Sequence, residues 1–460
     1  MNPAPAKSLR EAFDVYTRPR VIAMLFLGFA AGLPFPLVFT TLSVWLRDVG
    51  VDRTTIGFFA WIGITYSIKV FWSPVVDRAR LPVVTRLLGQ RRSWMLVAQI
   101  VIALGLIGMA FTDPSRGVLA TALFALLVAF ASATQDVAID AYRIEAVSGE
   151  LQGAMAGTYQ TGYRLAAALV GGAGALYLAD FFSWTASYLT MALAMGVGLT
   201  TVLVIAEPQL SIGRETAVRE QRVIDYLARS AHLPSAWRTA VAWLIGAVLC
   251  PFTDFFQRNG WWAVLILAFI SVYRISDIVL GNMAYPFYID LGFSKVEIAN
   301  VAKVFGVAMT IAGALIGGAL VTRFGVMRIL LLGAICVAAT NLAFAVLAVS
   351  GQNLVGLALV ISADNLSGGL AASAFIAYLS RLTNTAYTAT QYALFSSLMT
   401  LAPKIISGFS GVIVDAFGYV TFFIYASALG IPAIALVLYL IVRLNVDDSP
   451  PPIVESGQSQ

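Results

Sequence analysis

The sequence has very little of the chemistry that most enzymes and metalloproteins use. Its 460 residues include one histidine, His232, and two cysteines, Cys250 and Cys336. Two cysteines make no disulfide framework, and a single histidine gives little basis for zinc binding or for acid–base catalysis. No glycine-rich phosphate loop is present either. We therefore expect no metal site and no cofactor, and the sequence does not favour an enzyme.

Charged residues are also scarce. Only 12% of the residues are charged and 59% are hydrophobic, whereas a soluble protein has roughly 25% charged residues. The net charge of +5 does not indicate nucleic-acid binding, because the basic residues follow a membrane pattern. The composition predicts an all-α, polytopic membrane protein that contacts the lipid bilayer.

Apolar stretches long enough to cross a bilayer, which needs about 18 residues or more, occur repeatedly. They predict twelve transmembrane helices, at residues 20–46, 55–77, 93–112, 117–142, 152–179, 184–205, 261–289, 296–321, 326–349, 354–379, 388–414 and 419–443.

The stretch between the sixth and seventh helices is different. Residues 207–236 are polar and basic, and 237–257 contain a short apolar run that Pro251 interrupts. That run is too short to span comfortably, so we expect an interfacial helix, with insertion as the alternative. We expect an N-terminal six-helix bundle, 1–206; a cytoplasmic connector with the interfacial helix, 207–260; a C-terminal six-helix bundle, 261–446; and a disordered tail, 447–460.

The distribution of Arg and Lys predicts the topology. With the N-terminus inside, 20 of the 29 basic residues fall in cytoplasmic segments and four in outside loops, and the other five lie within helices. Cytoplasmic loops of membrane proteins carry such an excess. We therefore expect both termini on the cytoplasmic side.

The two halves of the chain resemble each other. The segment that begins at Asp48 resembles the one that begins at Asp290, and Gln152 corresponds to Gln391 near the start of helices five and eleven. These matches share nearly one offset, so they indicate two pseudo-symmetric six-helix bundles. In transporters built from such repeats, the solute site lies between the halves near the bilayer midplane.

Helix four carries an unusual polar run. Asp136 and Asp140 are four residues apart and share one helix face, while Asp140 and Arg143 are three apart and can pair. Two carboxylates in a low-dielectric site do not both stay ionised easily, so one of them is suited to carry a proton. The alternative is that both form salt bridges at the cytoplasmic end. We predict Asp136 and Asp140 as proton-coupling residues, with Asp136 favoured.

Other polar and charged side chains fall inside the predicted helices, where a charge costs roughly 2.5–3.5 kcal/mol. Arg164 and Lys404 occupy corresponding depths in helices five and eleven and have no helical carboxylate nearby, so we expect them to meet an anionic solute. For Arg274 and Asp277, a self-contained pair is an equal alternative. The predicted substrate-binding residues are Arg164, Lys404, Gln160, Tyr159, Tyr163, Gln391, Lys69, Arg274, Asp277 and Asp364.

The loop after helix two resembles the cytoplasmic gating motif of the major facilitator superfamily, and the loop after helix eight repeats it. The first copy has about ten extra residues before Gly89. An acidic side chain at one helix end that faces arginines of another forms a breakable latch. The predicted gating residues are Asp77, Arg78, Arg91, Arg92, Arg323 and Arg328.

Five strings resemble the AmpG permeases of that superfamily. They are Gly32-Leu-Pro34, Trp45-Leu-Arg-Asp48, Ala133-Thr-Gln-Asp-Val-Ala-Ile-Asp-Ala-Tyr-Arg143, Ala389-Thr-Gln-Tyr-Ala-Leu-Phe-Ser-Ser-Leu398 and Gly408-Phe-Ser-Gly-Val-Ile-Val-Asp-Ala-Phe-Gly-Tyr419.

This resemblance implies a monomeric, proton-coupled importer in the bacterial inner membrane that carries anhydromuropeptides for cell-wall recycling. Those solutes carry peptide carboxylates, which suits the expected cations. A siderophore or another anionic solute is the alternative substrate. A membrane-embedded enzyme or a sensor is the alternative class.

Overall fold

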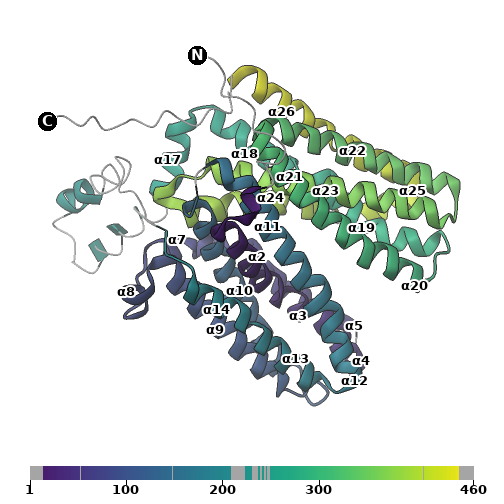
Figure 1. The fold of residues 1–460 in the computed structure, drawn as a ribbon, viewed down its shortest axis with the longest axis horizontal. Helices are drawn as coiled ribbons and strands as arrows, with labels where there is room; N and C mark the ends of the chain where they lie inside the picture. Colours follow the sequence, from purple (N-terminus) through teal and green to yellow (C-terminus); the bar gives the residue numbers. More distant parts are fainter. Residues whose placement is uncertain are drawn as a thin grey trace.

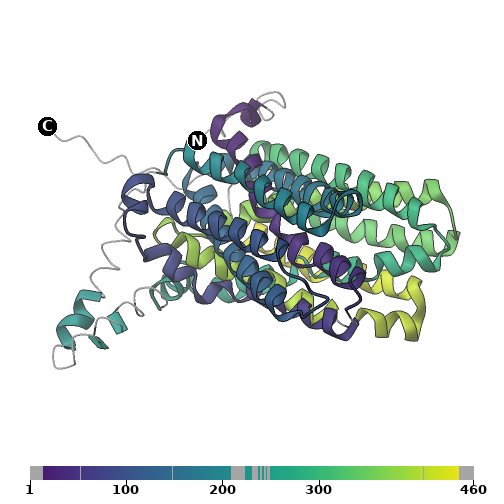
Figure 2. The ribbon, with the colours of Figure 1, turned by 90° about the horizontal axis from the view of Figure 1, so that it is seen from below.

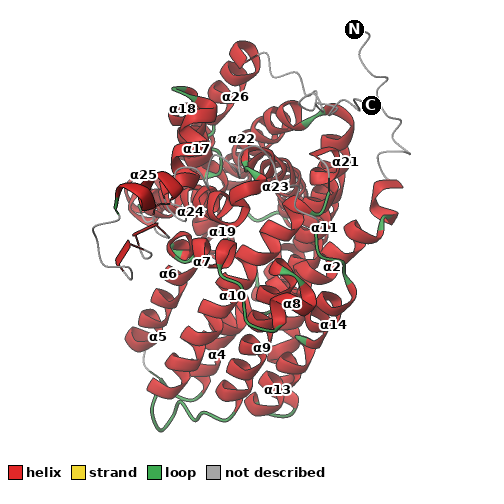
Figure 3. Cartoon of the chain, turned by 90° about the vertical axis from the view of Figure 1, so that its left-hand side faces the viewer, coloured by secondary structure: helices red, strands yellow, loops and turns green. Residues whose placement is uncertain are grey.

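The computed structural model describes residues 14–51, 53–147, 149–208, 223–230, 237–238, 241–242, 245, 249–407 and 409–444. Within these ranges the chain forms helices joined by loops and turns and contains no strand (Figure 3). The all-α prediction is confirmed.

The N-terminal half consists of helices that run back and forth along the molecule (Figure 1). They are η1 (Val15–Thr17), α2 (Pro19–Gly32), α3 (Pro34–Val38), α4 (Thr40–Asp48), α5 (Arg53–Phe59), η2 (Ala60–Gly63), α6 (Ile64–Ser67), η3 (Lys69–Phe71), α7 (Ser73–Arg78), α8 (Val84–Leu88), α9 (Gln90–Ala110), α10 (Leu119–Glu145), η4 (Gly149–Leu151), α11 (Gln152–Arg164), η5 (Leu165–Gly174), α12 (Ala175–Phe181), α13 (Trp184–Ala194) and α14 (Gly196–Val204).

The C-terminal half has longer unbroken helices. They are α17 (Cys250–Asn259), α18 (Trp262–Val272), α19 (Ile275–Asp290), α20 (Lys295–Ile298), η7 (Ala299–Phe305), α21 (Gly306–Phe324), α22 (Val326–Ser350), α23 (Leu354–Leu382), η8 (Thr385–Tyr387), α24 (Thr388–Ser407), α25 (Ser410–Ala428) and α26 (Ile431–Leu444). In Figure 2 the long helices of both halves run in nearly the same direction.

Ten helical stretches among the described residues are long and apolar enough to cross a membrane. The two other predicted spans fall in the broken segment from α5 to α7 and in α24 with the start of α25. Gly418 has a φ of 76° and interrupts the helical backbone inside α25, between the eleventh and twelfth predicted spans. The twelve-helix, two-bundle architecture predicted from the sequence agrees with this arrangement.

Small residues allow neighbouring helices to approach closely. A Cβ atom on Gly28 would lie 2.2 Å from the carbonyl oxygen of Tyr159, and one on Gly313 would lie 2.1 Å from that of Leu366. These distances are far below van der Waals contact, so only glycine fits at either position. Gly28 and Gly32 therefore let α2 pack closely against α11, and Gly313 and Gly317 do the same for α21 against α23.

The two halves converge at one end of the molecule and diverge at the other (Figure 1). We call the converging end the basic end, because the five arginines of the 78–92 loop, Arg143 and Arg323 lie there. At this end α11 packs against α21 and α23, and α24 packs against α7 and α10. We call the other end, which includes Asp48 and Asp290, the splayed end.

The predicted interfacial helix is described only in part. Most of residues 231–248, which hold the centre of its apolar run, lie outside the described residues, as do the tail 447–460 and Lys7 and Arg10. The described α17 buries Pro251 and Phe255 and packs against α18 and α24.

Candidate functional site

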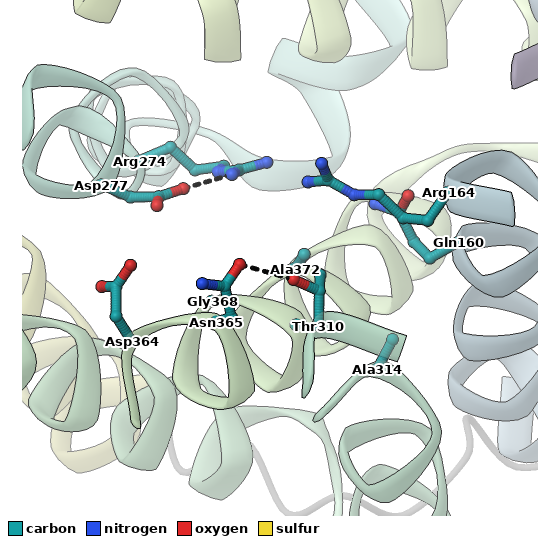
Figure 4. Close-up of a pocket in the computed structure, with 11 residues that line it drawn as sticks. Gln160, Arg164, Arg274, Asp277, Thr310, Ala314, Asp364, Asn365, Gly368 and Ala372 are labelled. Atoms are coloured by element: carbon teal, nitrogen blue, oxygen red, sulfur yellow. Dashed lines mark hydrogen bonds and ion pairs between the residues drawn. The ribbon is translucent and has the colours of Figure 1, made fainter. Parts of the chain in front are cut away.

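A cavity lies between the two halves. It holds roughly 420 Å³ of space, including its open mouth. One wall comes from α11, and the other comes from the start of α19 and from α21 and α23 (Figure 4). The polar residues that line it are Gln160, Arg164, Arg274, Asp277, Thr310, Asp364 and Asn365. Five of these seven belong to the predicted substrate-binding set, so the structure brings those five together.

Two guanidinium groups face each other across this cavity. Arg164, at the end of α11, points from the N-terminal half toward Arg274, which precedes α19 in the C-terminal half (Figure 4). Arg274 forms an ion pair with Asp277, whereas Arg164 has no ion pair within the described residues. The α-helix gives way to a wider π-helical segment directly after Arg164, a feature often seen at functional sites. An anion between the two groups would relieve their repulsion.

The remaining polar wall is built by α21, α22 and α23. Thr310 donates a hydrogen bond to Asn365 at 2.7 Å, and the Asn365 amide donates to the carbonyl of Ile361 at 2.9 Å. The Thr340 hydroxyl lies 3.3 Å from Asp364 Oδ1. Asn365 is thereby fixed, while most of the Asp364 carboxylate remains available to the cavity.

The predicted proton carriers lie elsewhere, on α10. Arg143 pairs with Asp140 at 3.3 Å, which confirms the predicted i,i+3 pair. Asp136 Oδ1 is buried with no hydrogen-bond partner among the described residues. Lys69 is only 8% exposed and lies within electrostatic reach of Asp136. Neither carboxylate lines the cavity, and their proton-carrying role stays a prediction.

Lys404 and the two tyrosines also lie outside the cavity wall. Lys404 donates a hydrogen bond from Nζ to Ser67 Oγ at 3.1 Å, which links α24 to α6. The rings of Tyr159 and Tyr163 are 6.2 Å apart, and Tyr159 packs in the core against α2. The structure therefore places Arg164 opposite Arg274 and not beside Lys404.

Gln391 is buried at the basic end. Its amide donates to the carbonyl of Pro251 at 2.9 Å and to Asp254 at 2.8 Å, and its oxygen accepts from the backbone N–H of Asn384 and from Arg258. These bonds tie α24 to α17, and Gln391 does not line the cavity. Its predicted contact with substrate stays a prediction.

Asp77 forms the centre of the predicted gate. Its carboxylate accepts hydrogen bonds from the backbone N–H groups of Ala389 and Thr390, at 3.1 and 2.8 Å, and from the Thr390 hydroxyl at 2.7 Å. It also pairs with Arg91 at 2.9 Å, and Arg91 pairs with Glu145 at 2.7 Å. An anion at the start of α24 is stabilised by the exposed N–H groups and the helix dipole. Asp77 therefore joins the two halves.

The extra residues of the first gating loop form a short helix, α8, before Gly89. This insertion leaves the Asp77–Arg91 pair intact. Arg78 is the last residue of α7. Arg92 instead donates to the carbonyls of Val202 and Leu203 at the end of α14, so its bonds stay within one half.

In the second gating loop, Arg323 lies over the ring of Phe324 at 4.9 Å, and Arg328 is exposed in the first turn of α22. Neither side chain reproduces the bonds of Asp77 and Arg91 in this conformation. The latch is therefore built mainly from the first copy of the motif.

Two further groups at the basic end join the halves. Arg143 donates to Ser380 Oγ at 2.6 Å, and Tyr16 donates to the carbonyl of Leu315 at 2.6 Å. Sequence reasoning missed Tyr16 and the cavity residue Thr310. A lone tyrosine before a first helix, or a lone threonine inside an apolar helix, gives no local pattern that marks such a contact.

Two helical bundles with a charged cavity between them define a membrane transporter. A model of the Major Facilitator Superfamily matches residues 24–403 and 267–459. Among solved structures, the proton:xylose symporter XylE bound to 6-bromo-6-deoxy-D-glucose is 13% identical with a TM-score of 0.61, covering 95% of this chain and 97% of its own. The human organic anion transporter MFSD10 is 14% identical with a TM-score of 0.59, covering 94% and 100%. These two likenesses concern the fold.

Curated relatives are closer in sequence. A putative transporter AmpG 4 of Rickettsia conorii is 34% identical over 93% of this chain and 98% of its own length. The anhydromuropeptide permease of Escherichia coli K12 is 33% identical over 94% of this chain and 82% of its own. The chain belongs to the Major Facilitator Superfamily and, within it, to the AmpG permeases.

Proposed function

We propose that this protein imports anhydromuropeptides across the bacterial inner membrane and couples their uptake to protons. The observation that carries the proposal is the cavity in which Arg164 and Arg274 face each other from opposite halves (Figure 4). A peptide carboxylate between them would make charge-assisted bonds to both halves at once. The permease name of the Escherichia coli relative supports this class of solute.

The rest of the cavity suits the other parts of such a solute. Gln160, Thr310 and Asn365 offer amide and hydroxyl groups to sugar hydroxyls and acetamido groups. Gly368 leaves space and lets a ligand approach the backbone, because a Cβ there would meet only Asp277 Oδ1, at 3.9 Å. Lys404 on α24 and Lys69 in η3 lie where α6, η3, α10 and α24 meet. Both stay predicted contacts for a solute of this length.

Orientation follows from the basic residues. The basic end faces the cytoplasm under the positive-inside rule, with both termini on that side. The conformation in which the halves meet at the basic end and diverge at the splayed end then presents the cavity outward, ready for uptake. Breaking the Asp77 latch at the basic end would release the solute inward. The bundles 1–206 and 261–446 would move as the two units, joined by the connector 207–260.

Proton coupling requires a carboxyl group that gains and loses a proton during the cycle. Asp136 and Asp140 are the carriers predicted from the sequence. The Oδ1 atom of Asp136 is buried and has no hydrogen-bond partner among the residues that the structure describes, which is compatible with that role. The chain acts as a transporter and not as an enzyme, and we expect it to work as a monomer.

Uptake into proteoliposomes tests the proposal. A labelled anhydromuropeptide with free carboxylates should accumulate under an inward proton gradient, and it should not accumulate without one. Arg164→Ala should weaken its binding by about 1.5–3 kcal/mol, the value of a hydrogen bond to a charged group. The same change should barely affect an amidated, neutral analogue.

Arg116→Ala is the matched control, because Arg116 is an exposed arginine paired with Asp113 in a loop. Equal losses for the anionic and neutral ligands would assign Arg164 to the fold. Accumulation of a ferric siderophore with no muropeptide uptake would move the chain to the siderophore alternative.

A further inference from the structure

Asp364 is an acidic side chain of the cavity without a cation of its own. Arg274 is already paired with Asp277, and Asp364 has no ion pair within the described part of the chain. Its one polar contact there is the Thr340 hydroxyl, 3.3 Å from Oδ1. In Figure 4 its carboxylate stands apart from the Arg274–Asp277 pair. Asp364 therefore has no neighbouring cation that would keep it ionised once a further negative charge enters the cavity.

The charges of the cavity add up to zero when it is empty. Its described lining holds two cations, Arg164 and Arg274, and two carboxylates, Asp277 and Asp364. An anionic solute between the arginines would bring the total to minus one in a partly enclosed site between the two halves. Uncompensated charge in such a site is costly. One proton taken up by a carboxylate of the cavity restores neutrality.

Asp364 is better placed for that proton than the other carboxylates. Asp277 is held as an anion by Arg274, and Asp140 is held by Arg143. Asp136 lies within reach of the buried Lys69 and does not line the cavity. Asp364 alone among these four both faces the solute site and lacks a neighbouring cation that could keep it ionised.

The hydrogen bonds of Thr340 leave room for a proton on Asp364. The single Thr340 hydroxyl proton has two possible acceptors, the carbonyl of Val337 at 3.0 Å and Asp364 Oδ1 at 3.3 Å. When it points to Val337, the Thr340 oxygen can accept a bond from a protonated Asp364. Asp364 can therefore hydrogen-bond to Thr340 in either protonation state, as an acceptor when ionised and as a donor when protonated.

Other charged and titratable groups face Asp364 from the elements around it. On α19 they are Arg274, Asp277 and Tyr288, and on α11 across the cavity there is Arg164. The cavity-lining groups of α21, which include Thr310, are uncharged. A second carboxylate, Asp277, near Asp364 further disfavours two simultaneous negative charges.

We propose that Asp364 takes up one proton from the open side of the cavity when an anionic solute binds between Arg164 and Arg274. This inference rests on the proposed function, because it needs an anionic solute. The proton forms an O–H bond on the Asp364 carboxylate, which then donates to Thr340. Once the solute leaves toward the basic end, that O–H bond breaks, the proton passes to water, and the carboxylate is restored.

Proton uptake on binding measures this step directly. Purified protein in weakly buffered solution with a pH dye should take up about one proton per anhydromuropeptide bound. By linkage, the wild-type affinity should then fall by up to about tenfold for each pH unit of increase in the titration range. Asp364→Asn, which mimics the protonated form, should bind the solute as tightly as wild type at low pH. Its binding should be independent of pH and should take up no proton.

Three controls separate the possible failures. Thermal unfolding of Asp364→Asn shows whether the variant is folded, and an amidated neutral solute should bind to wild type with no proton uptake. If wild type binds no anhydromuropeptide at all, the proposed function fails. If wild type binds it and Asp364→Asn still takes up a full proton, the inference about Asp364 is overturned. Loss of uptake in Asp136→Asn with normal uptake in Asp364→Asn would overturn it as well and would assign the proton to Asp136.

Discussion

The two ends of the interface between the halves differ in what their polar groups bind. At the basic end, Asp77, Arg143 and Tyr16 of the N-terminal half all bond to groups of the C-terminal half. At the splayed end, the described bonds stay within one half: Trp184 donates to Asp48, Tyr419 to Asp290, and Gln352 to the carbonyl of Gly292.

The difference shows which contacts stabilise the observed conformation: those between the halves at the basic end. Glycines let α11 and α21 touch at the basic end, because a Cβ on Gly318 would lie 2.5 Å from the carbonyl of Gly153. Polar bonds then lock the contact. Bonds within one half at the splayed end let each half move there without losing them. The basic end must therefore be opened for release, and changes there should shift the equilibrium far more than changes at the splayed end.

The largest effect is expected from blocking the helix contact itself. Gly318→Leu would place side-chain atoms where Gly153 and Tyr16 now lie, so the basic end should no longer close. Transport should fall at least tenfold. A cysteine pair at Glu150 and Thr322, where the Thr322 hydroxyl bonds to the Glu150 carbonyl at 3.4 Å, should cross-link efficiently in the parent and poorly in the variant.

Gly196→Leu is the matched control, because nothing lies within 4 Å of a Cβ at that position. It should leave both transport and cross-linking close to parent values. Efficient cross-linking in Gly318→Leu would show that the two helices tolerate a larger separation than the structure indicates.

A smaller effect is expected from the latch. Asp77→Asn removes the charge that α24 and Arg91 bind, at a cost of about 1.5–3 kcal/mol for a charge-assisted bond. This corresponds to a shift of roughly tenfold to a hundredfold toward the state open at the basic end. Spin-label distances across the basic end should lengthen in a larger fraction of molecules.

Asp113→Asn supplies the comparison at the splayed end. Asp113 and Arg116 form an exposed pair between α9 and α10, and such surface pairs contribute little. The distance distribution of this variant should match wild type. An equal shift in both variants would remove the distinction between the two ends.

Much of this architecture could be predicted from the sequence, because membrane crossing leaves strong local signals. Apolar length gave the spans, and the spacing of Asp140 and Arg143 gave their pair. The four-residue spacing of Gly28 and Gly32 is typical of closely packed membrane helices, and both glycines contact the backbone of α11. These features depend on residues near one another in the chain, so helical periodicity is enough to find them.

The site was harder to predict, because its partners are far apart in the chain. Arg164 and Lys404 were expected to meet the same anionic solute on grounds of symmetry. Arg164 instead faces Arg274, since α11 packs against α21 and α23 while α24 packs against α7 and α10. Gln391 matched Gln152 by position, but both are buried at the basic end. Pseudo-symmetry predicts depth in the membrane and does not predict which helix lies opposite.

The smallest expected effect concerns Tyr16, which lies before the first membrane helix and reaches across to α21. Its hydroxyl donates to the Leu315 carbonyl at 2.6 Å and lies beside Gly157 and Gly318. Tyr16→Phe keeps the ring in the contact and removes the hydroxyl, and with it the neutral bond to Leu315, which contributes about 0.5–1.5 kcal/mol. The ratio of molecules closed to molecules open at the basic end should therefore fall by roughly twofold to tenfold, as measured by cross-linking of the Glu150 and Thr322 cysteine pair. Tyr177→Phe, at an exposed tyrosine on α12 toward the splayed end, should change nothing in the same assay. A Tyr16→Phe protein that cross-links like its parent would show that the ring and not the hydroxyl holds this segment in place.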